Sequence, residues 1–285
     1  MTEALEDHPA IQSIRRDGFL SAAIVGVIPI LRGLHQAWFD LAEQANRLGQ
    51  RRMNAVEAAC FDRSTQDPIS LAARLLIRTQ SGLQAVLILA ERGMTLEAEA
   101  LVRGLYENSF WLAYLQANPS EAVQAIRWDE LRSQIGRSKA LVAQVDLGDD
   151  PDAALRGKLL AQIANAEREV RGKPRLGVEA LANKGEFGDL YMFYKMLSSS
   201  SAHPSLHSLS KHLLMDTEGS AIGHVVGPDQ EGTARALTLA VHAHLSCLAA
   251  FNATWPEGDG VGEVAALFTA HTALSKAARG AAEAP

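Results

Sequence analysis

The same helix-start signal occurs three times along this chain. An aspartate or asparagine stands directly before Pro68, Pro119 and Pro151. The short polar side chain caps free amide groups of a first helical turn, and proline fits that turn because no amide hydrogen is needed there. Each pair therefore predicts the start of a helix, and the three together favour an all-α fold.

The composition agrees with a helical fold. Hydrophobic residues make up 47% of the 285 residues, which is the ordinary globular range. Alanine and leucine dominate, while long runs of the β-branched and aromatic residues that favour strands are missing. No alternating strand pattern, internal repeat or linker occurs. We predict one multi-helix bundle domain over residues 1–285, with frayed ends at about 1–10 and 280–285.

Further signals divide this domain into helices. Gly93 predicts the end of one helix, and Thr95 the cap of the next. The apolar stretch 19–31 contains Pro29 and is too short to span a membrane, so we predict a buried N-terminal helix there. Residues 217–229 are rich in glycine and are expected to form a loop. The other helices are expected at 68–92, 95–117, from 119, from about 151 to 172, and at 186–199, 231–255 and 262–279.

Charge and cysteine content limit the class of function. The formal net charge is −6 and no cluster of lysine and arginine occurs, so a surface for double-stranded DNA is not expected. Cys60 and Cys247 stand far apart and offer neither a disulfide framework nor a zinc knuckle. Both are expected to be small buried hydrophobes. We expect a cytoplasmic protein without membrane contact.

The helix over 95–117 carries an unusual polar pair. Arg103 and Glu107 lie among aromatic side chains, on the face opposite the apolar stripe. When arginine precedes glutamate by four residues, the pair stabilises an exposed helix less than the reverse order does. The pair is therefore better explained by a structural or functional role than by stabilisation of the helix surface. The stripe that we expect to face the core consists of Leu101, Leu105, Leu112 and Leu115.

A second polar segment follows an aromatic helix much later in the chain. Four serines run from Ser198 to Ser201, and Pro204 forces His203 out of helical geometry. His203 is therefore expected at a helix-to-loop corner. We predict that Arg103, Glu107 and His203 meet in space, because one carboxylate cannot satisfy five guanidinium donors. No histidine has a carboxylate or cysteine at ligand spacing, so no metal and no other cofactor is expected.

Two patches together resemble a known family. The stretch AEALVRGLYENSFWLAYL resembles an alanine- and leucine-rich helix with Arg-x-x-x-Glu, and YKMLSSSSAHPS resembles a Tyr-Arg-x-Leu-Ser…His segment. The pair is similar to a bacterial helical family catalogued as a domain of unknown function (number five-six-seven-seven). That family resembles, more distantly, the HEPN superfamily of helical bundles, which implies an HEPN-like core.

Many HEPN proteins are metal-independent RNases of toxin and phage-defence systems, with an arginine and a histidine at a helix end in a dimer cleft. The resemblance implies that His203 is the general acid or base and that Lys195 or Arg103 stabilises the phosphorane, with Glu107 orienting Arg103. Lys195 stands where the signature has arginine, and seven residues separate it from His203. The residues expected to bind substrate are Ser198, Ser199 and Tyr194.

A second interpretation, from a different class, stays open. The chain is then a non-catalytic helical protein that regulates a partner or binds a small anionic ligand around Arg103. Arg103, Glu107 and His203 form a structural polar cluster in that case, and the acidic net charge favours it. The first interpretation expects RNA as the partner, the second a protein or a small anion, and a homodimer is compatible with both.

Overall fold

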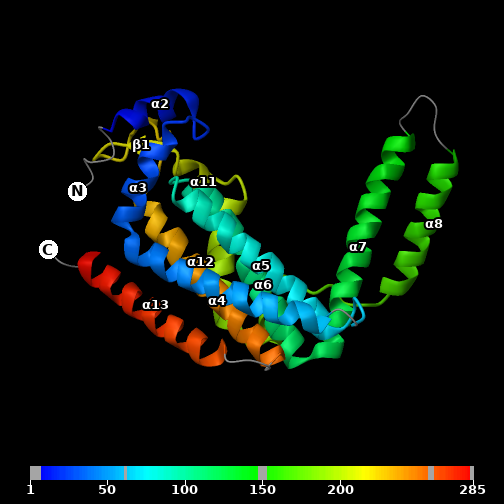
Figure 1. The fold of residues 1–285 in the computed structure, drawn as a ribbon. Coiled ribbons are helices and arrows are strands. Elements are labelled where there is room, and N and C mark those ends of the chain that lie inside the picture. Colours follow the sequence, from blue (N-terminus) through cyan, green and yellow to red (C-terminus); the bar gives the residue numbers. More distant parts are fainter. Residues whose placement is uncertain (1–7, 61–62, 147–152, 256–259, 283–285) are drawn as a thin grey trace.

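The computed structural model describes residues 8–60, 63–146, 153–255 and 260–282. In these residues the fold is helical apart from one two-stranded hairpin (Figure 1). The prediction of an all-α fold is therefore confirmed. The expected frayed ends lie largely outside the described residues, although 9–10 and 280–282 are helical, and the predicted helix start at Asp150-Pro151 also lies outside them.

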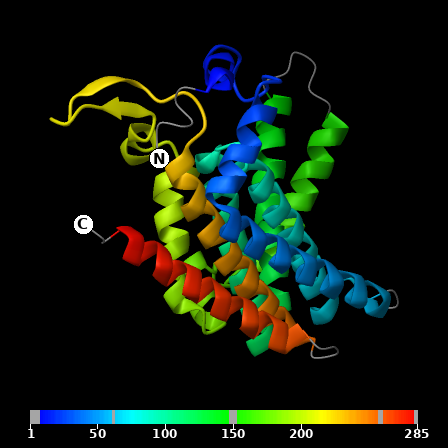
Figure 2. The ribbon, with the colours of Figure 1, turned by 60° about the vertical axis from the view of Figure 1, so that its left-hand side comes forward.

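The central helix is α6 (Thr95–Ala117), with the predicted bounds. It packs between α5 (Pro68–Ala90) and α12 (Gln230–Thr254), the two helices that contact it most extensively. A second pair, α4 (Gln36–Cys60) and α13 (Gly260–Ala282), lies along α12, and α4 also covers α5 (Figures 1 and 2). These contacts make α6 the central helix of the bundle.

Local capping explains the bounds of α5 and α6. The Asp67 carboxylate accepts hydrogen bonds from two amides of the first turn of α5, as predicted. Gly93 has a φ of 74°, the left-handed conformation that ends a helix. The expected cap at Thr95 is wrong, because Thr95 is already the first residue of α6. Its hydroxyl instead donates to the carboxylate of Asp229, before α12.

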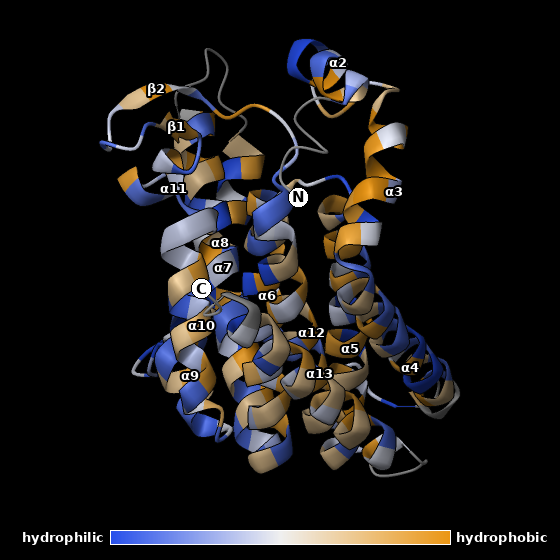
Figure 3. Cartoon of the chain, turned by 90° about the vertical axis from the view of Figure 1, so that its left-hand side faces the viewer, coloured by the Kyte–Doolittle hydropathy of each residue, from blue (hydrophilic) through white to orange (hydrophobic). Residues whose placement is uncertain are grey.

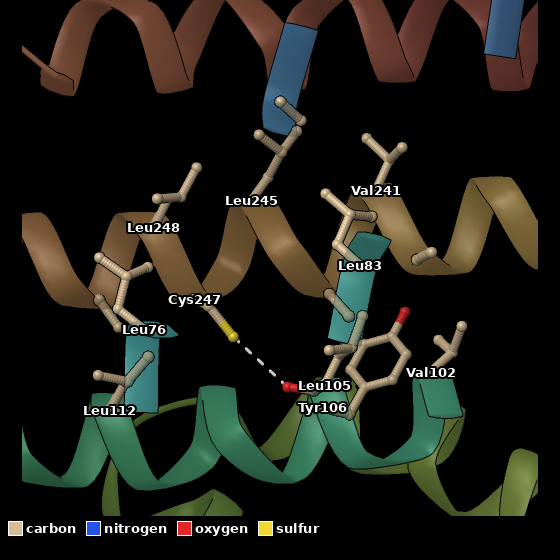
Figure 4. Packing of buried hydrophobic residues seen from close by; sticks show 14 of the residues in the cluster. Leu76, Leu83, Val102, Leu105, Tyr106, Leu112, Val241, Leu245, Cys247 and Leu248 are labelled. Atoms are coloured by element: carbon tan, nitrogen blue, oxygen red, sulfur yellow. Dashed lines mark hydrogen bonds between the residues drawn. The ribbon is translucent and has the colours of Figure 1, made fainter. Parts of the chain in front are cut away.

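The core lies where α5, α6 and α12 meet (Figure 4). Leu105, Leu112 and Leu115 are buried as predicted. Leu101 is 40% exposed, so its assignment to the core stripe is wrong. The buried side of α6 includes Val102 and Leu105, and at 100° per residue Leu101 lies at its rim. The leucines of α5 and α12 that surround this side of α6 are Leu76, Leu83, Leu245 and Leu248.

Two helices form an arm that projects from the bundle. α7 (Pro119–Asp146) and α8 (Ala153–Val170) run antiparallel to each other, and α7 meets α6 and α5 at its base (Figure 1). The side chains of α8 that are buried in the arm are Leu159, Ile163 and Ala166. Since only two helices meet in the arm, most of its surface stays exposed.

The segment after the arm returns to α6. It contains α9 (Val178–Lys184), a 3-10 turn and α10 (Tyr191–Leu197), all within or next to the helix expected at 186–199. A π-helical turn, Ser198–Ala202, follows α10 and packs on α6. It ends at His203, whose extended backbone agrees with the predicted corner before proline.

No strand is predicted from the sequence, and this is wrong for one hairpin. After α11 (Leu206–Ser210), β1 (Leu213–Met215) pairs antiparallel with β2 (Ala221–His224). Of the two strands, β2 lies within the loop expected at 217–229, and β1 precedes it. The turn is held by the Asp216 carboxylate, which accepts two amide hydrogen bonds within it. Both strands are short apolar runs, so the alternation that signals a strand is missing.

The N-terminal helix is only partly buried. α2 (Pro9–Asp17) and α3 (Ile24–Leu34) form a small apolar cluster of their own at one end of the bundle (Figure 3). The prediction of a buried helix over 19–31 is wrong for its first part, since Leu20 is fully exposed and Val25 is 68% exposed. α3 packs only on α2 and α4, so one side remains uncovered.

In the described part of the chain, one helix is long and apolar enough to cross a membrane by length and composition. This helix is α12, and 78% of its apolar stretch is buried inside the bundle. Burial of this degree is typical of a core helix.

We predict that Leu105→Ala and Leu112→Ala each lower the free energy of unfolding by about 2–5 kcal/mol, because each leaves a cavity beside α6. The matched control is Leu101→Ala, which removes the same atoms from an exposed position and should cost less than about 1 kcal/mol. Urea unfolding of the three variants measures these differences. A loss below about 0.5 kcal/mol for Leu105→Ala would contradict the described core.

Candidate functional site

The two polar segments of the sequence meet at Arg103. The guanidinium Nε donates to Ser198 Oγ at 2.8 Å, and Nη2 donates to the Tyr194 hydroxyl. The guanidinium carbon also lies 4.6 Å from the centre of the Tyr194 ring. Arg103 therefore joins the end of α10 to the middle of α6 by two hydrogen bonds and a cation–π contact.

Glu107 makes a long ion pair with Arg103. Its Oε2 lies 4.0 Å from Nη1 of Arg103, and the two side chains are 37% and 27% exposed. An ion pair of this length and exposure contributes little to stability. Two of the three guanidinium nitrogens therefore donate a hydrogen bond, and the third has only this long ion pair. We call Arg103, Glu107, Tyr194 and Ser198 the Arg103 cluster.

One face of α6 remains open beside the Arg103 cluster. Two hollows reach this face, one towards the N-terminal end of α6 and one towards its C-terminal end. At 100° per residue, the residues that border them lie within about 120° of one another around the helix. These residues are Leu96, Glu97, Ala100, Gly104, Glu107, Asn108 and Trp111, and Arg103 lies between the two sets along the helix.

The larger hollow, which we call the Trp111 hollow, lies between α5, α6 and the base of α7. Its volume is about 370 Å³, within the range of small-molecule sites. α5 contributes Arg74 and Arg78, α7 contributes Asp129 and Glu130, and Trp111 of α6 lies between them. The remaining lining residues are Leu71, Leu75, Gly104, Glu107, Asn108 and Ile126.

Some charged side chains of this hollow already have protein partners, and others do not. Arg74 donates to the backbone carbonyls of Ser70 and Thr65, and Glu130 is paired with Arg137 at 2.7 Å. Arg78 and Asp129 make no side-chain hydrogen bond or ion pair with any residue in the described ranges. The hollow therefore presents one free cation and one free anion.

Asn108 adds a fixed acceptor. Its side chain is 6% exposed, and its amide nitrogen donates to Thr79 Oγ1 at 3.2 Å. Thr79 is held in turn by a hydrogen bond to the Leu75 carbonyl. This arrangement uses the amide nitrogen and leaves the amide oxygen of Asn108 for a group inside the hollow.

The smaller hollow, the His203 hollow, lies between the N-terminal part of α6 and α11, with a volume of about 280 Å³. His203 and His212 both border it, together with Glu97. Both imidazoles are exposed and make no side-chain hydrogen bond within the described residues. His203 therefore shares a hollow with Ala100 of α6 and makes no hydrogen bond to Arg103 or Glu107.

The other candidate residues lie outside both hollows. Lys195 is exposed, and its ammonium contacts no partner among the described side chains. Ser199 is exposed, and its hydroxyl donates to the Met196 carbonyl. The structure thus brings four predicted residues together in the Arg103 cluster and places Lys195, Ser199 and His203 apart from it.

Sequence reasoning missed the residues that three separate helices bring to the hollows. Arg78, Asn108 and Asp129 belong to α5, α6 and α7, and each alone is typical of a solvated helix face. Glu97 stands in the first turn of α6 and His212 follows α11, and neither position signals a site in the sequence. The spacing of Arg74 and Arg78 was the one available signal, since it puts two cations on one face of α5.

Buried titratable groups of the core are not acid–base candidates at neutral pH. Burial lowers the pKa of His244 to about 4, and burial together with His271 lowers the pKa of His242 to about 4. Burial raises the pKa of the Cys247 thiol to about 12. Cys247 is fully buried, as expected, whereas Cys60 is only half-buried. Within the described ranges, no three histidine, cysteine or acidic side chains are arranged to hold a metal ion.

Comparison with known proteins identifies one family. The model of a "Family of unknown function (DUF5677)" matches residues 70–221, more than half of the chain. This span includes the Arg103 cluster, the arm and most of the lining of both hollows, but not α12. No curated protein and no solved structure matches the chain.

We predict that Arg103→Ala lowers the free energy of unfolding by about 1–3 kcal/mol, because two hydrogen bonds and the contact with Tyr194 are lost. Glu107→Gln should change it by less than about 0.5 kcal/mol, since the ion pair is long and exposed. Arg47→Ala, at an exposed position of α4, is the control for loss of an arginine. Equal stability of Arg103→Ala and Arg47→Ala in urea would show that the cluster does not hold α10 on α6.

Proposed function

The chain belongs to DUF5677, a family of unknown function, and because no activity follows from that membership we propose a function from the site itself. The protein is a non-catalytic helical binding protein whose small charged ligand occupies the Trp111 hollow. The Arg103 cluster is structural in this proposal and holds α10 against the helix that carries the ligand site.

The observation that supports this proposal is the combination of space and unused polar groups. The Trp111 hollow has a volume of about 370 Å³ and contains an indole ring, a buried amide and two unpaired charges. Ligand sites in proteins typically combine an apolar or aromatic surface with a few convergent polar groups. Arg78 and Asp129, which have no protein partner within the described residues, are available to such a ligand.

We assign the ligand to this hollow rather than to Arg103. An anion at Arg103 would compete with the Glu107 carboxylate, and in a fork geometry also with Ser198 or Tyr194, for the guanidinium. The energy of the new contacts would then be offset by the loss of existing ones. Arg78 has no such partner to lose, which favours the hollow as the site of the small anion-bearing ligand expected from the sequence.

A blocking variant tests the proposal. Gly104 borders the hollow, and an added Cβ there would meet no atom within 4 Å. Gly104→Leu should therefore fill the hollow without destabilising α6, because leucine is the better helix former. Gly157→Leu, in the exposed arm helix α8 with equal free space, is the matched control.

The measurement is the melting temperature in the presence of a panel of amino acids, amines, carboxylates and nucleotides. At least one class should raise the melting temperature of the parent and of Gly157→Leu, because a ligand that binds only the folded state stabilises it. Gly104→Leu should lose that response. A panel without effect on the parent, or an equal response in Gly104→Leu, contradicts the proposed site.

The second candidate function is metal-independent RNA cleavage of the toxin or defence type, at the His203 hollow. One observation favours it: His203 and His212 border the same hollow with free imidazoles. One imidazole would take the proton of the 2′-hydroxyl, and the other would protonate the leaving 5′-oxygen. Glu97 brings negative charge to this hollow and Lys195 lies outside it, so the binding function is preferred.

We predict for this second candidate that His203→Ala abolishes cleavage of single-stranded RNA, because it removes one of the two proton-transfer groups, while the melting temperature changes little. His207→Ala removes another exposed histidine of the same region, outside the hollow, and should leave cleavage intact. Gel analysis of a labelled RNA measures both. No cleavage by the parent, or equal cleavage by His203→Ala, excludes this role of His203.

A further inference from the structure

We infer that the ligand of the Trp111 hollow is amphoteric, with a cationic group held on the α7 side and an anionic group held at Arg78 on the α5 side. This inference rests on the proposed binding function and specifies the chemical class of the ligand. A molecule with a protonated amine or guanidine at one end and a carboxylate or phosphate at the other fits this description.

The two sides of the hollow carry opposite charges. Both α5 residues that reach it with a charged group are arginines, Arg74 and Arg78. Both charged residues of α7 that reach it are acids, Asp129 and Glu130. A ligand between α5 and α7 therefore meets positive charge on one side and negative charge on the other.

Two of these four charged side chains already have partners in the protein, and two do not. The guanidinium of Arg74 is held by backbone carbonyls, and the Glu130 carboxylate is paired with Arg137. Arg78 and Asp129 keep their hydrogen-bonding groups free within the described residues, and they make no ion pair with each other. A free guanidinium binds a carboxylate or phosphate in a fork geometry, while a free carboxylate binds an ammonium or guanidinium.

The side chains of α6 extend the cation-binding side. The Asn108 amide oxygen is an acceptor, and the Glu107 carboxylate is bound to Arg103 only at 4.0 Å. Trp111 offers an aromatic ring, the side chain over which cations bind best. Two acceptors and an indole thus lie between α7 and Arg78, and they favour the cationic group and an apolar body next to it.

A singly charged ligand would pair with only one of the two unpaired charges, Arg78 or Asp129. An amine would leave the exposed Arg78 guanidinium without a partner in the ligand, and a simple anion would do the same to the exposed Asp129 carboxylate. The volume of about 370 Å³ corresponds to roughly twelve water molecules. The hollow therefore suits a molecule of amino-acid size with both charges, rather than an inorganic ion.

Two matched sets of probes test the inference by titration calorimetry. The rigid set is 4-(aminomethyl)benzoate, benzylamine and benzoate, and the flexible set is 6-aminohexanoate, hexylamine and hexanoate. Within a set the body is constant and only the charged ends differ. We expect the doubly charged member of at least one set to bind at least about tenfold more tightly than either singly charged member.

Substitutions assign each end of the probe. Arg78→Gln should weaken the doubly charged probe about tenfold and leave the amine unchanged, because only the anionic end loses its partner. Asp129→Asn should weaken the doubly charged probe and the amine and leave the carboxylate unchanged. Arg47→Gln and Asp40→Asn, at exposed positions of α4 outside the hollow, are the matched controls and should have no effect.

The outcomes separate this inference from the proposed function. If an amine or a carboxylate binds as tightly as its doubly charged partner, or if only other members of the ligand panel bind, the hollow is a ligand site and the amphoteric assignment is wrong. If neither the probes nor any panel member bind, both the inference and the proposed function fail. Equal affinity of Arg78→Gln and the parent for a doubly charged probe also overturns the inference.

Discussion

The structure depends on the close packing of α6 between α5 and α12. Leu105 of α6 lies against Gly82 of α5, where an added Cβ would approach the Leu105 side chain to 2.6 Å. The small residue lets the two helix backbones approach each other, so that leucines of all three helices fill the space between them. The other elements pack on this trio or extend from it. The one face of α6 left open is where both hollows lie, so the packing that stabilises the bundle also fixes the geometry of the site.

Local signals in the sequence predicted the helices well because their causes are local. The cap at Asp67 and the left-handed Gly93 act within one or two turns, and they fixed the bounds of α5 and the start of α6. The β-hairpin and the exposure of Leu101 were predicted wrongly. The hairpin rests on local turn hydrogen bonds at Asp216, but its two short strands lack the alternation by which a strand is recognised in sequence. The exposure of Leu101 depends instead on which elements cover α6, and residues near it in the sequence do not determine that.

The contacts of Arg103 could be predicted because this side chain needs more acceptors than its own helix supplies. Counting the donors of Arg103 indicated that acceptors must come from another element, and Ser198 and Tyr194 supply them. The Trp111 hollow had no such requirement, because Arg78 and Asp129 are stable in water without partners. When charged residues are stable in water without a protein partner, the sequence gives no signal that the fold brings them close together. Such residues are also the ones that remain available to a ligand.

The arm has a consequence for how such a ligand would act. α7 and α8 bury few side chains between them and meet the bundle only at the base, so this pair unfolds locally at a lower free-energy cost than the three-helix core. Asp129 lies on that base, so one side of the Trp111 hollow belongs to the arm. Occupancy of the hollow and order in the arm are then thermodynamically linked: whatever stabilises one favours the other by the same free energy.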